Sequence, residues 1–143
     1  MSATSNRLIC LLTGLWWGSL CTVGLLVVPL LFKHLPTPAM AGGLAAKLFS
    51  AQTALSIFCC LSVSLLLGSR WGQENPKNRR PGSAFTWVLA GMFAALLAEF
   101  AVAPRIVAHD NLPLWHGVGS VLYLTQILCS GLAFWKNLSA PQT

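Results

Sequence analysis

The 143-residue chain is 55% hydrophobic and 8% charged, with a formal net charge of +6 and a mean hydropathy of +0.68. Soluble domains usually contain about 25% charged residues, so this composition excludes an ordinary soluble domain and favours an integral membrane protein. The apolar runs are continuous and lack the alternation of a membrane β-barrel, and they therefore predict helices.

Four apolar runs follow one another along the chain, at about residues 8–32, 48–67, 84–103 and 114–135. Each contains roughly 20 residues or more, the length that an α-helix needs to cross a hydrocarbon core of about 30 Å. The first run is longer than the apolar part of a signal peptide, which has about 7 to 15 residues, so we expect an uncleaved span. We predict an all-α fold, a bundle of four transmembrane helices in one domain that covers residues 1–143.

Prolines mark the loops between these runs. Thr37 is a suitable N-cap for a helix that has Pro38 at its first position, so we expect the second helix to begin near Pro38. The fold also has room for a short extra helix in the first outer loop. Pro29 and Pro104 each precede a histidine by five residues, and this shared spacing hints at two related hairpins.

Small residues at helical spacing predict the faces through which the helices pack. The second run carries small or polar residues at every fourth position: Gln52, Ser56, Cys60, Ser64 and Gly68. These residues share one helical face, and close backbone approach holds helices together in lipid. A similar face with Gly91, Ala95 and Glu99 would turn Glu99 towards the bundle. Gly14 and Gly18 form a G-x-x-x-G pair that could serve internal packing or dimerisation.

Basic residues are distributed unevenly between the two sides of the predicted bundle. Three of them, Lys33, Lys47 and Arg105, fall on the side of the first and third loops. Six fall on the side of the termini and the second loop: Arg7, Arg70, Lys77, Arg79, Arg80 and Lys136. Because cytoplasmic loops are enriched in Lys and Arg, we predict a multi-pass protein of a cell inner membrane with both termini cytoplasmic. The lipid bilayer is the expected partner, and no nucleic-acid partner is expected.

Polar residues gather towards the outer side of the predicted spans. We expect Gln52, Glu99 and His116 in the outer third of the bundle, with Arg105 at its mouth and Ser120 one turn after His116. An ionisable group at membrane depth is costly unless it is paired or wet, so Glu99 marks a candidate functional site. These five residues form the candidate ligand-binding set.

Several interpretations of this set stay open. Glu99, Gln52 and His116 could form a hydrogen-bonded cluster that fixes helix register, or a ligand or proton site that is open to the outside. A zinc site normally takes three or four ligands, and His34, His109 and His116 are weak candidates for a divalent metal because no H-x-x-x-H spacing occurs. Haem would need a histidine that faces the core, for which His116 is the candidate. We expect no cofactor and no enzymatic activity, since no nucleophile–base pair or nucleotide-binding motif occurs in the sequence.

Short motifs carry a family resemblance. They are LLFKHLP at 30–36, AG at 41–42, KLF at 47–49, PR at 104–105 and HG at 116–117, followed by Ser120 and Gln126. This pattern resembles the transmembrane-protein-205-like family, whose bacterial members are described as a domain of unknown function. The resemblance implies a four-helix membrane protein, an association of the human relative with resistance to platinum drugs, and no established reaction. The chain departs from the family pattern at Ser120, which stands one position late, and at Glu99, where the family tends to have asparagine.

Three functions are compatible with these features. The first is small-solute or metal-linked transport, tolerance or binding at the outer polar set. The second is a structural or assembly subunit of a membrane complex, or a homo-oligomer, that packs through the small-residue faces. The third is a haem-binding redox membrane protein.

Overall fold

The computed structural model describes residues 3–71 and 83–139. Over these two ranges the chain is helical, and no strand occurs in them. Four helical segments are long and apolar enough to cross a membrane: Thr4–His34, Pro38–Gly68, Ala84–Val107 and Leu112–Leu138. The predicted all-α class and its four spans are confirmed, and the chain is a multi-pass membrane protein.

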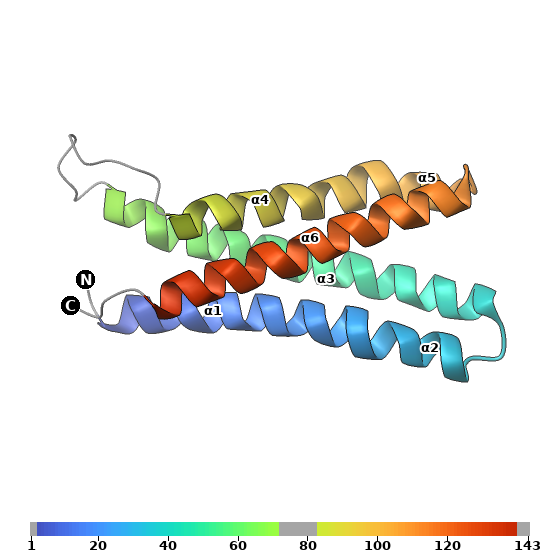
Figure 1. Cartoon of the computed structure of the whole chain (residues 1–143), viewed down its shortest axis with the longest axis horizontal. Helices are drawn as coiled ribbons and strands as arrows, with labels where there is room; N and C mark the ends of the chain where they lie inside the picture. Colours follow the sequence, from blue (N-terminus) through green and yellow to red (C-terminus); the bar gives the residue numbers. More distant parts are fainter. Residues whose placement is uncertain (1–2, 72–82, 140–143) are drawn as a thin grey trace.

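Two of the four spans are divided by a π-helical segment. The first span consists of α1 (Ala3–Cys21), the π-helical η1 (Thr22–Val27) and α2 (Val28–His34). The third consists of α4 (Ser83–Leu97), the π-helical η3 (Ala98–Val102) and α5 (Ala103–Val107). The second and fourth spans are the single helices α3 (Pro38–Trp71) and α6 (Leu112–Leu138) (Figure 1).

Each π-helical segment directly precedes a proline. The N–H of Val28 donates to the carbonyl of Val23, and the N–H of Ala103 donates to the carbonyl of Ala98, five residues earlier in both cases. Pro29 follows Val28, and Pro104 follows Ala103. A proline cannot donate a hydrogen bond, and its ring clashes with the carbonyl four residues before it. A π turn shifts that carbonyl, so each helix continues through its proline.

The first loop is only the three residues 35–37, because α3 starts directly after it. The Oγ1 of Thr37 accepts a hydrogen bond from the N–H of Met40 at 3.3 Å, and its carbonyl accepts one from the N–H of Ala41 at 3.1 Å. Pro38 occupies the first helical position, where a missing N–H does no harm. The predicted start of the second helix is confirmed. The extra helix considered for this loop does not form, because the loop residues are part of one cap and α3 is continuous.

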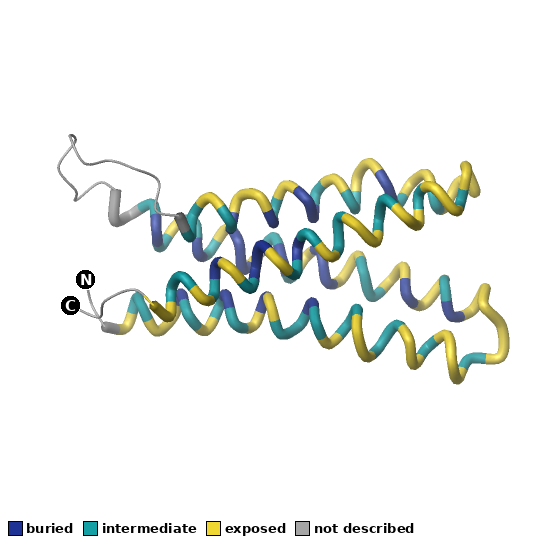
Figure 2. Tube along the Cα trace, in the orientation of Figure 1, coloured by how far each residue is buried: buried dark blue, intermediate teal, exposed yellow. Residues whose placement is uncertain are grey.

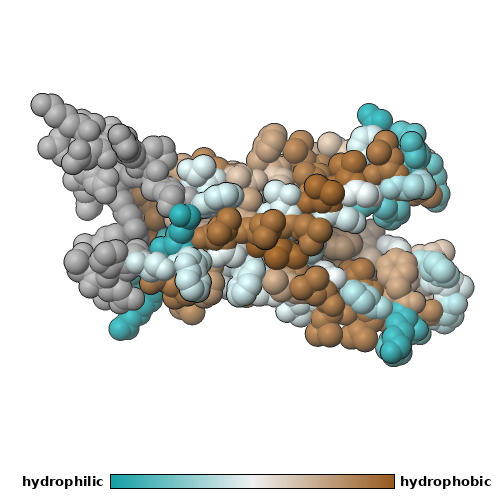
Figure 3. Space-filling view, in the orientation of Figure 1, coloured by the Kyte–Doolittle hydropathy of each residue, from teal (hydrophilic) through white to brown (hydrophobic). Residues whose placement is uncertain are grey.

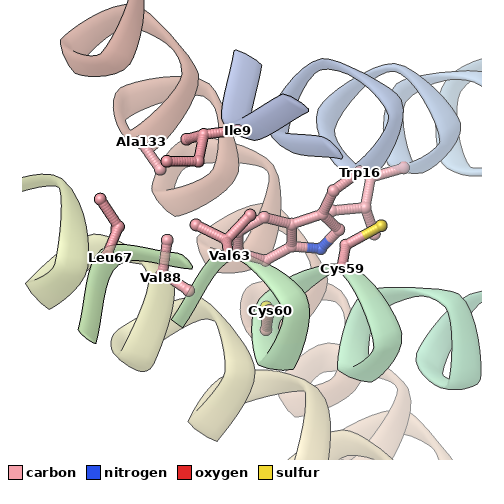
Figure 4. Close-up of a cluster of buried hydrophobic side chains, with 9 residues drawn as sticks. Ile9, Trp16, Cys59, Cys60, Val63, Leu67, Val88 and Ala133 are labelled. Carbon is pink, nitrogen blue, oxygen red and sulfur yellow. The ribbon is translucent and has the colours of Figure 1, made fainter. Parts of the chain in front are cut away.

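The four spans form one antiparallel bundle around a core near the end where α1 begins and α6 ends. α1 packs against α3 and α6, and α4 packs against the same two helices. Trp16 is fully buried at the centre (Figure 4), together with residues from all four spans: Ile9, Leu20, Cys59, Cys60, Val63, Leu67, Val88 and Ala133. Its indole reaches α4 because Gly91 has no side chain there: a Cβ on Gly91 would lie 2.6 Å from Cη2 of Trp16.

The predicted packing faces are largely confirmed. Gln52, Ser56 and Cys60 are buried on α3, as is Ala95 on α4. The Ser56 hydroxyl donates to the carbonyl of Gln52 at 2.9 Å, which satisfies it within its own helix. This is the usual way in which a helical span buries a serine.

The two glycines of the G-x-x-x-G pair have different surroundings. Gly14 packs beneath the ring of Phe134 from α6. Around Gly18, no side chain or neighbouring element among the described residues lies within 4 Å of the position that a Cβ would take. Gly14 therefore serves internal packing, and Gly18 does not.

The sides of the bundle expose large apolar side chains. Leu65 is 75% exposed, Phe100 73% and Leu11 70%. Figure 3 shows apolar residues along the sides and hydrophilic residues towards the ends. Such exposure is unfavourable in water and favourable in lipid, so these faces are suited to contact the bilayer.

Candidate functional site

The bundle is loosely packed at the end that carries the loop 35–37 and the turn 108–111, which we call the open end. Here α2 packs on α3, and η3 and α5 pack on α6, but in the described ranges no extensive contact joins one pair to the other. The buried apolar residues towards this end are small or few: Ala41, Ala45 and Val102. Exposed positions dominate there in Figure 2, and the surface in Figure 3 is notched between the two hairpin tips.

Glu99 lies where the first hairpin (α1 to α3) and the second hairpin (α4 to α6) separate. It belongs to η3, and because α5 ends at Val107 it lies about 12 Å from the end of its span, at roughly 1.5 Å per residue. The residue is half-buried, and its Oε1 accepts a hydrogen bond of 2.9 Å from the Oγ of Ser50 on α3. No Lys, Arg or His among the described residues forms an ion pair with Glu99. The carboxylate therefore links the two hairpins without a cationic partner.

Gln52 bonds to the first span and not to Glu99. Its Nε2 donates to the Oγ of Ser19 at 2.9 Å, and that hydroxyl donates to the carbonyl of Trp16 at 3.0 Å. Since α3 begins at Pro38, Gln52 lies about 21 Å from the end of its helix, near the middle of the span. This is deeper than the outer third that the sequence predicted, because α3 extends about ten residues beyond its apolar run.

Gln126 is a buried polar residue that was absent from the candidate set. It is 2% exposed and shares the inner face of α6 with Cys129. One turn away, the hydroxyl of Tyr123 donates to the carbonyl of Leu20 at 2.9 Å, and its ring meets Phe49 edge-on at 5.1 Å between centroids. The i, i+3, i+4 spacing of the inner residues of α6 was the signal that could have identified Gln126.

Arg105 holds the turn between the third and fourth spans. Its guanidinium lies 3.4 Å from Oδ2 of Asp110 and 5.0 Å above the ring of Trp115. Both partners of the ion pair are more than half exposed, so the pair contributes little stability. Arg105 thus interacts with Asp110 and Trp115 at the open end and not with Glu99.

His116 and Ser120 lie on the exposed side of α6. The Ser120 hydroxyl donates to the backbone carbonyl of His116 at 2.8 Å, and the imidazole is exposed. His116 therefore does not face the core, as a haem ligand between the helices would. The first turn of α6 presents it outwards, and the sequence alone does not fix that rotation.

His34 and His109 lie at the two hairpin tips. Both are exposed, and their Nδ1 atoms lie 3.0 Å from the carbonyl of Leu30 and 2.9 Å from the carbonyl of Val107. Within residues 3–71 and 83–139, no group of three His, Cys, Asp or Glu side chains is placed to hold a metal ion. The three histidines of the predicted metal set are not brought together.

A family model matches residues 11–111, which cover most of the first span, the second and third spans and the turn before α6. Its description is "Domain of unknown function (DUF4149)". The match covers most of the chain, so the chain belongs to this family. Neither the curated proteins nor the solved structures contain a match to it.

Proposed function

We propose that this member of the DUF4149 family is a membrane transport or tolerance protein that binds a small cationic solute at Glu99, in the open end of the bundle. One observation carries the proposal: a half-buried carboxylate at membrane depth has a hydroxyl partner, Ser50, but no cationic partner among the described residues. An ionised carboxylate in such surroundings is unfavourable until a positive charge joins it. A cationic ligand would supply that charge.

The residues around Glu99 favour a monovalent organic cation over a dehydrated metal ion. One carboxylate and one hydroxyl are fewer ligands than zinc takes, and the described ranges contain no three-ligand group. Ala46 and Ala54 are exposed one turn on either side of Ser50, so the face of α3 that presents the Ser50 hydroxyl is otherwise apolar at these positions. An organic cation with an apolar surface is complementary to both features.

Lys47 is the nearest competing charge along α3. It is exposed and lies one turn from Ser50 towards the open end, and no ion pair joins it to Glu99. Its positive charge would repel a cationic ligand. Replacing it by a neutral residue is therefore expected to strengthen binding.

The test is calorimetric titration of the protein, purified in detergent, with tetraethylammonium and separately with Zn²⁺. Glu99→Gln keeps the shape of the side chain and removes the charge, so it should weaken tetraethylammonium binding about tenfold or more, which corresponds to roughly 1.4 kcal/mol. Lys47→Gln should strengthen binding a few-fold. Asp110→Asn removes an exposed carboxylate at the same end and serves as the control, with little change expected.

Unchanged affinity for tetraethylammonium in Glu99→Gln would contradict a binding site at Glu99. Tighter binding of Zn²⁺ than of tetraethylammonium would contradict the proposed class of ligand. If the protein binds neither cation and extracts together with a stoichiometric membrane partner, the structural-subunit function replaces this proposal.

The proposal includes three finer assignments. The excess of basic residues on the side of the termini supports a cell inner membrane location with both termini cytoplasmic and the open end outside. The motifs LLFKHLP at 30–36 and PR at 104–105 support a place among the transmembrane-protein-205-like proteins. The shared bundle core supports treating residues 1–143 as one domain.

A further inference from the structure

The two hairpins repeat one sequence pattern at an offset of 75 residues. Between residues 27 and 42, five of the sixteen positions are identical to those 75 residues later: Val27 and Val102, Pro29 and Pro104, His34 and His109, Pro38 and Pro113, and Gly42 and Gly117. Three of the five pairs are proline or glycine, residues that determine backbone geometry. The apolar composition of the spans does not account for their recurrence.

The backbone repeats at the same offset. The five-residue hydrogen bonds from Val28 to Val23 and from Ala103 to Ala98 are equivalent, and both π-helical segments end at the equivalent residues Val27 and Val102. π turns are rare, so two of them at equivalent positions indicate that the two hairpins are structural repeats. The packing agrees, since the contact of α1 with α6 corresponds to that of α4 with α3. Such a pattern is that of parallel repeats related by an axis along the membrane normal.

Two contact regions between the hairpins, which we call seams, are equivalent in the repeat: α6 with η1, and α3 with η3. The side-chain contacts across the two seams differ. At the seam of α6 with η1, the ring of Tyr123 packs directly on Gly24, leaving no room for a Cβ, and its hydroxyl donates to the carbonyl of Leu20. At the seam of α3 with η3, the residue equivalent to Gly24 is Glu99, and its contact is one hydrogen bond from the exposed Ser50.

We infer that the protein is an internal repeat in which the α3/η3 seam opens while the α6/η1 seam stays closed, so that the α3/η3 seam is the entrance to Glu99. A hydrogen bond to an exposed hydroxyl can be exchanged for water or for a ligand, whereas an aromatic ring in close contact excludes both. The entrance role rests on the proposed cation site; the repeat and the difference between the seams do not.

The test is hydrogen–deuterium exchange of the full chain in detergent, without added cation, followed by mass spectrometry. The repeat supplies matched segments: residues 46–53 against 121–128, and 95–103 against 20–28. Backbone amides of the α3/η3 seam should exchange at least about threefold faster than those of the α6/η1 seam, because local opening controls exchange.

Matched variants separate seam opening from general loosening. Ser50→Ala should accelerate exchange at 46–53 and 95–103 only. Thr125→Ala changes the residue equivalent to Ser50, whose hydroxyl donates to the carbonyl of Val121 in its own helix, and should leave both seams unchanged. Gly24→Ala should accelerate exchange at 20–28, since its Cβ would displace the ring of Tyr123.

Equal exchange at the two seams of the wild type, or equal acceleration of both by Ser50→Ala, would overturn the inference. Saturating tetraethylammonium should slow exchange at the α3/η3 seam alone. If the seams differ as expected but tetraethylammonium has no effect, the cation site is wrong and the opening of this seam stands.

Discussion

At the scale of single residues, the close approach at Gly91 sets the position of α4 against α1. A Cβ there would lie 2.6 Å from Cη2 of Trp16 and 3.1 Å from the Cβ of Cys129. Trp16 is fully buried in the core cluster, so its ring cannot shift without repacking its neighbours. Gly91→Ala should therefore lower the free energy of unfolding by about 1–3 kcal/mol, the usual cost of overpacking a core. Denaturant unfolding in detergent measures the change.

Gly18→Ala is the matched control for that substitution, because no side chain or neighbouring element among the described residues lies within 4 Å of the added methyl group. Alanine is favoured over glycine in a helix by up to about 1 kcal/mol, so the free energy of unfolding should stay the same or rise. A clear loss at Gly18 would contradict its open surroundings and indicate that a second chain packs there.

At the scale of elements, the cap at Thr37 determines where α3 begins. Its side chain and its carbonyl each accept a backbone hydrogen bond from the first turn of the helix. Thr37→Ala should cost about 1 kcal/mol of unfolding free energy, the typical loss for an N-cap. Ser120→Ala removes a hydroxyl that bonds only within its own helix, and its effect should stay below about 0.5 kcal/mol. Equal effects of the two substitutions in thermal melts would show that the cap does not stabilise the fold.

The elements were predictable as far as they depend on local pattern. Span length and apolarity predicted four helices, and Thr37 with Pro38 predicted the start of α3. The two π-helical segments were not predictable, because they arise from how the backbone accommodates Pro29 and Pro104. Pro29 and Pro104 mark where each span must adjust, but the sequence does not show whether the backbone kinks or forms a π turn.

The candidate site was less predictable than the helices, because it depends on rotation and tilt. Spacing placed Gln52 on an inner face, and this was confirmed, but it did not show that its partner would be Ser19. Nor did it show that Ser50 would bond Glu99 or that His116 would be exposed. The rotation and tilt of a span are set by packing against its neighbours, which periodicity within one helix does not describe.

At the scale of the whole molecule, the bundle has two unlike ends, and orientation decides which compartment Glu99 faces. The open end carries the turn at Asn111, where the backbone turns with a φ of 34° before α6 begins. The opposite end is the one from which α1 starts and at which α6 ends. In the sequence, six of the nine Lys and Arg residues fall near the termini or between the second and third spans. Because basic residues are retained in the cytoplasm, the open end should lie outside.

Reporter fusions test this orientation directly. Green fluorescent protein fused after Thr143 should fluoresce, and alkaline phosphatase inserted at Asn111 should be active, because each works only on the side predicted for it. Lysines added beside Asn111 raise the basic count of the outer side towards six and should shift part of the population to the opposite topology. Phosphatase activity after Thr143, with none at Asn111, would invert the orientation. The carboxylate of Glu99 would then open to the cytoplasm, and a cation would be captured from inside the cell and not from outside it.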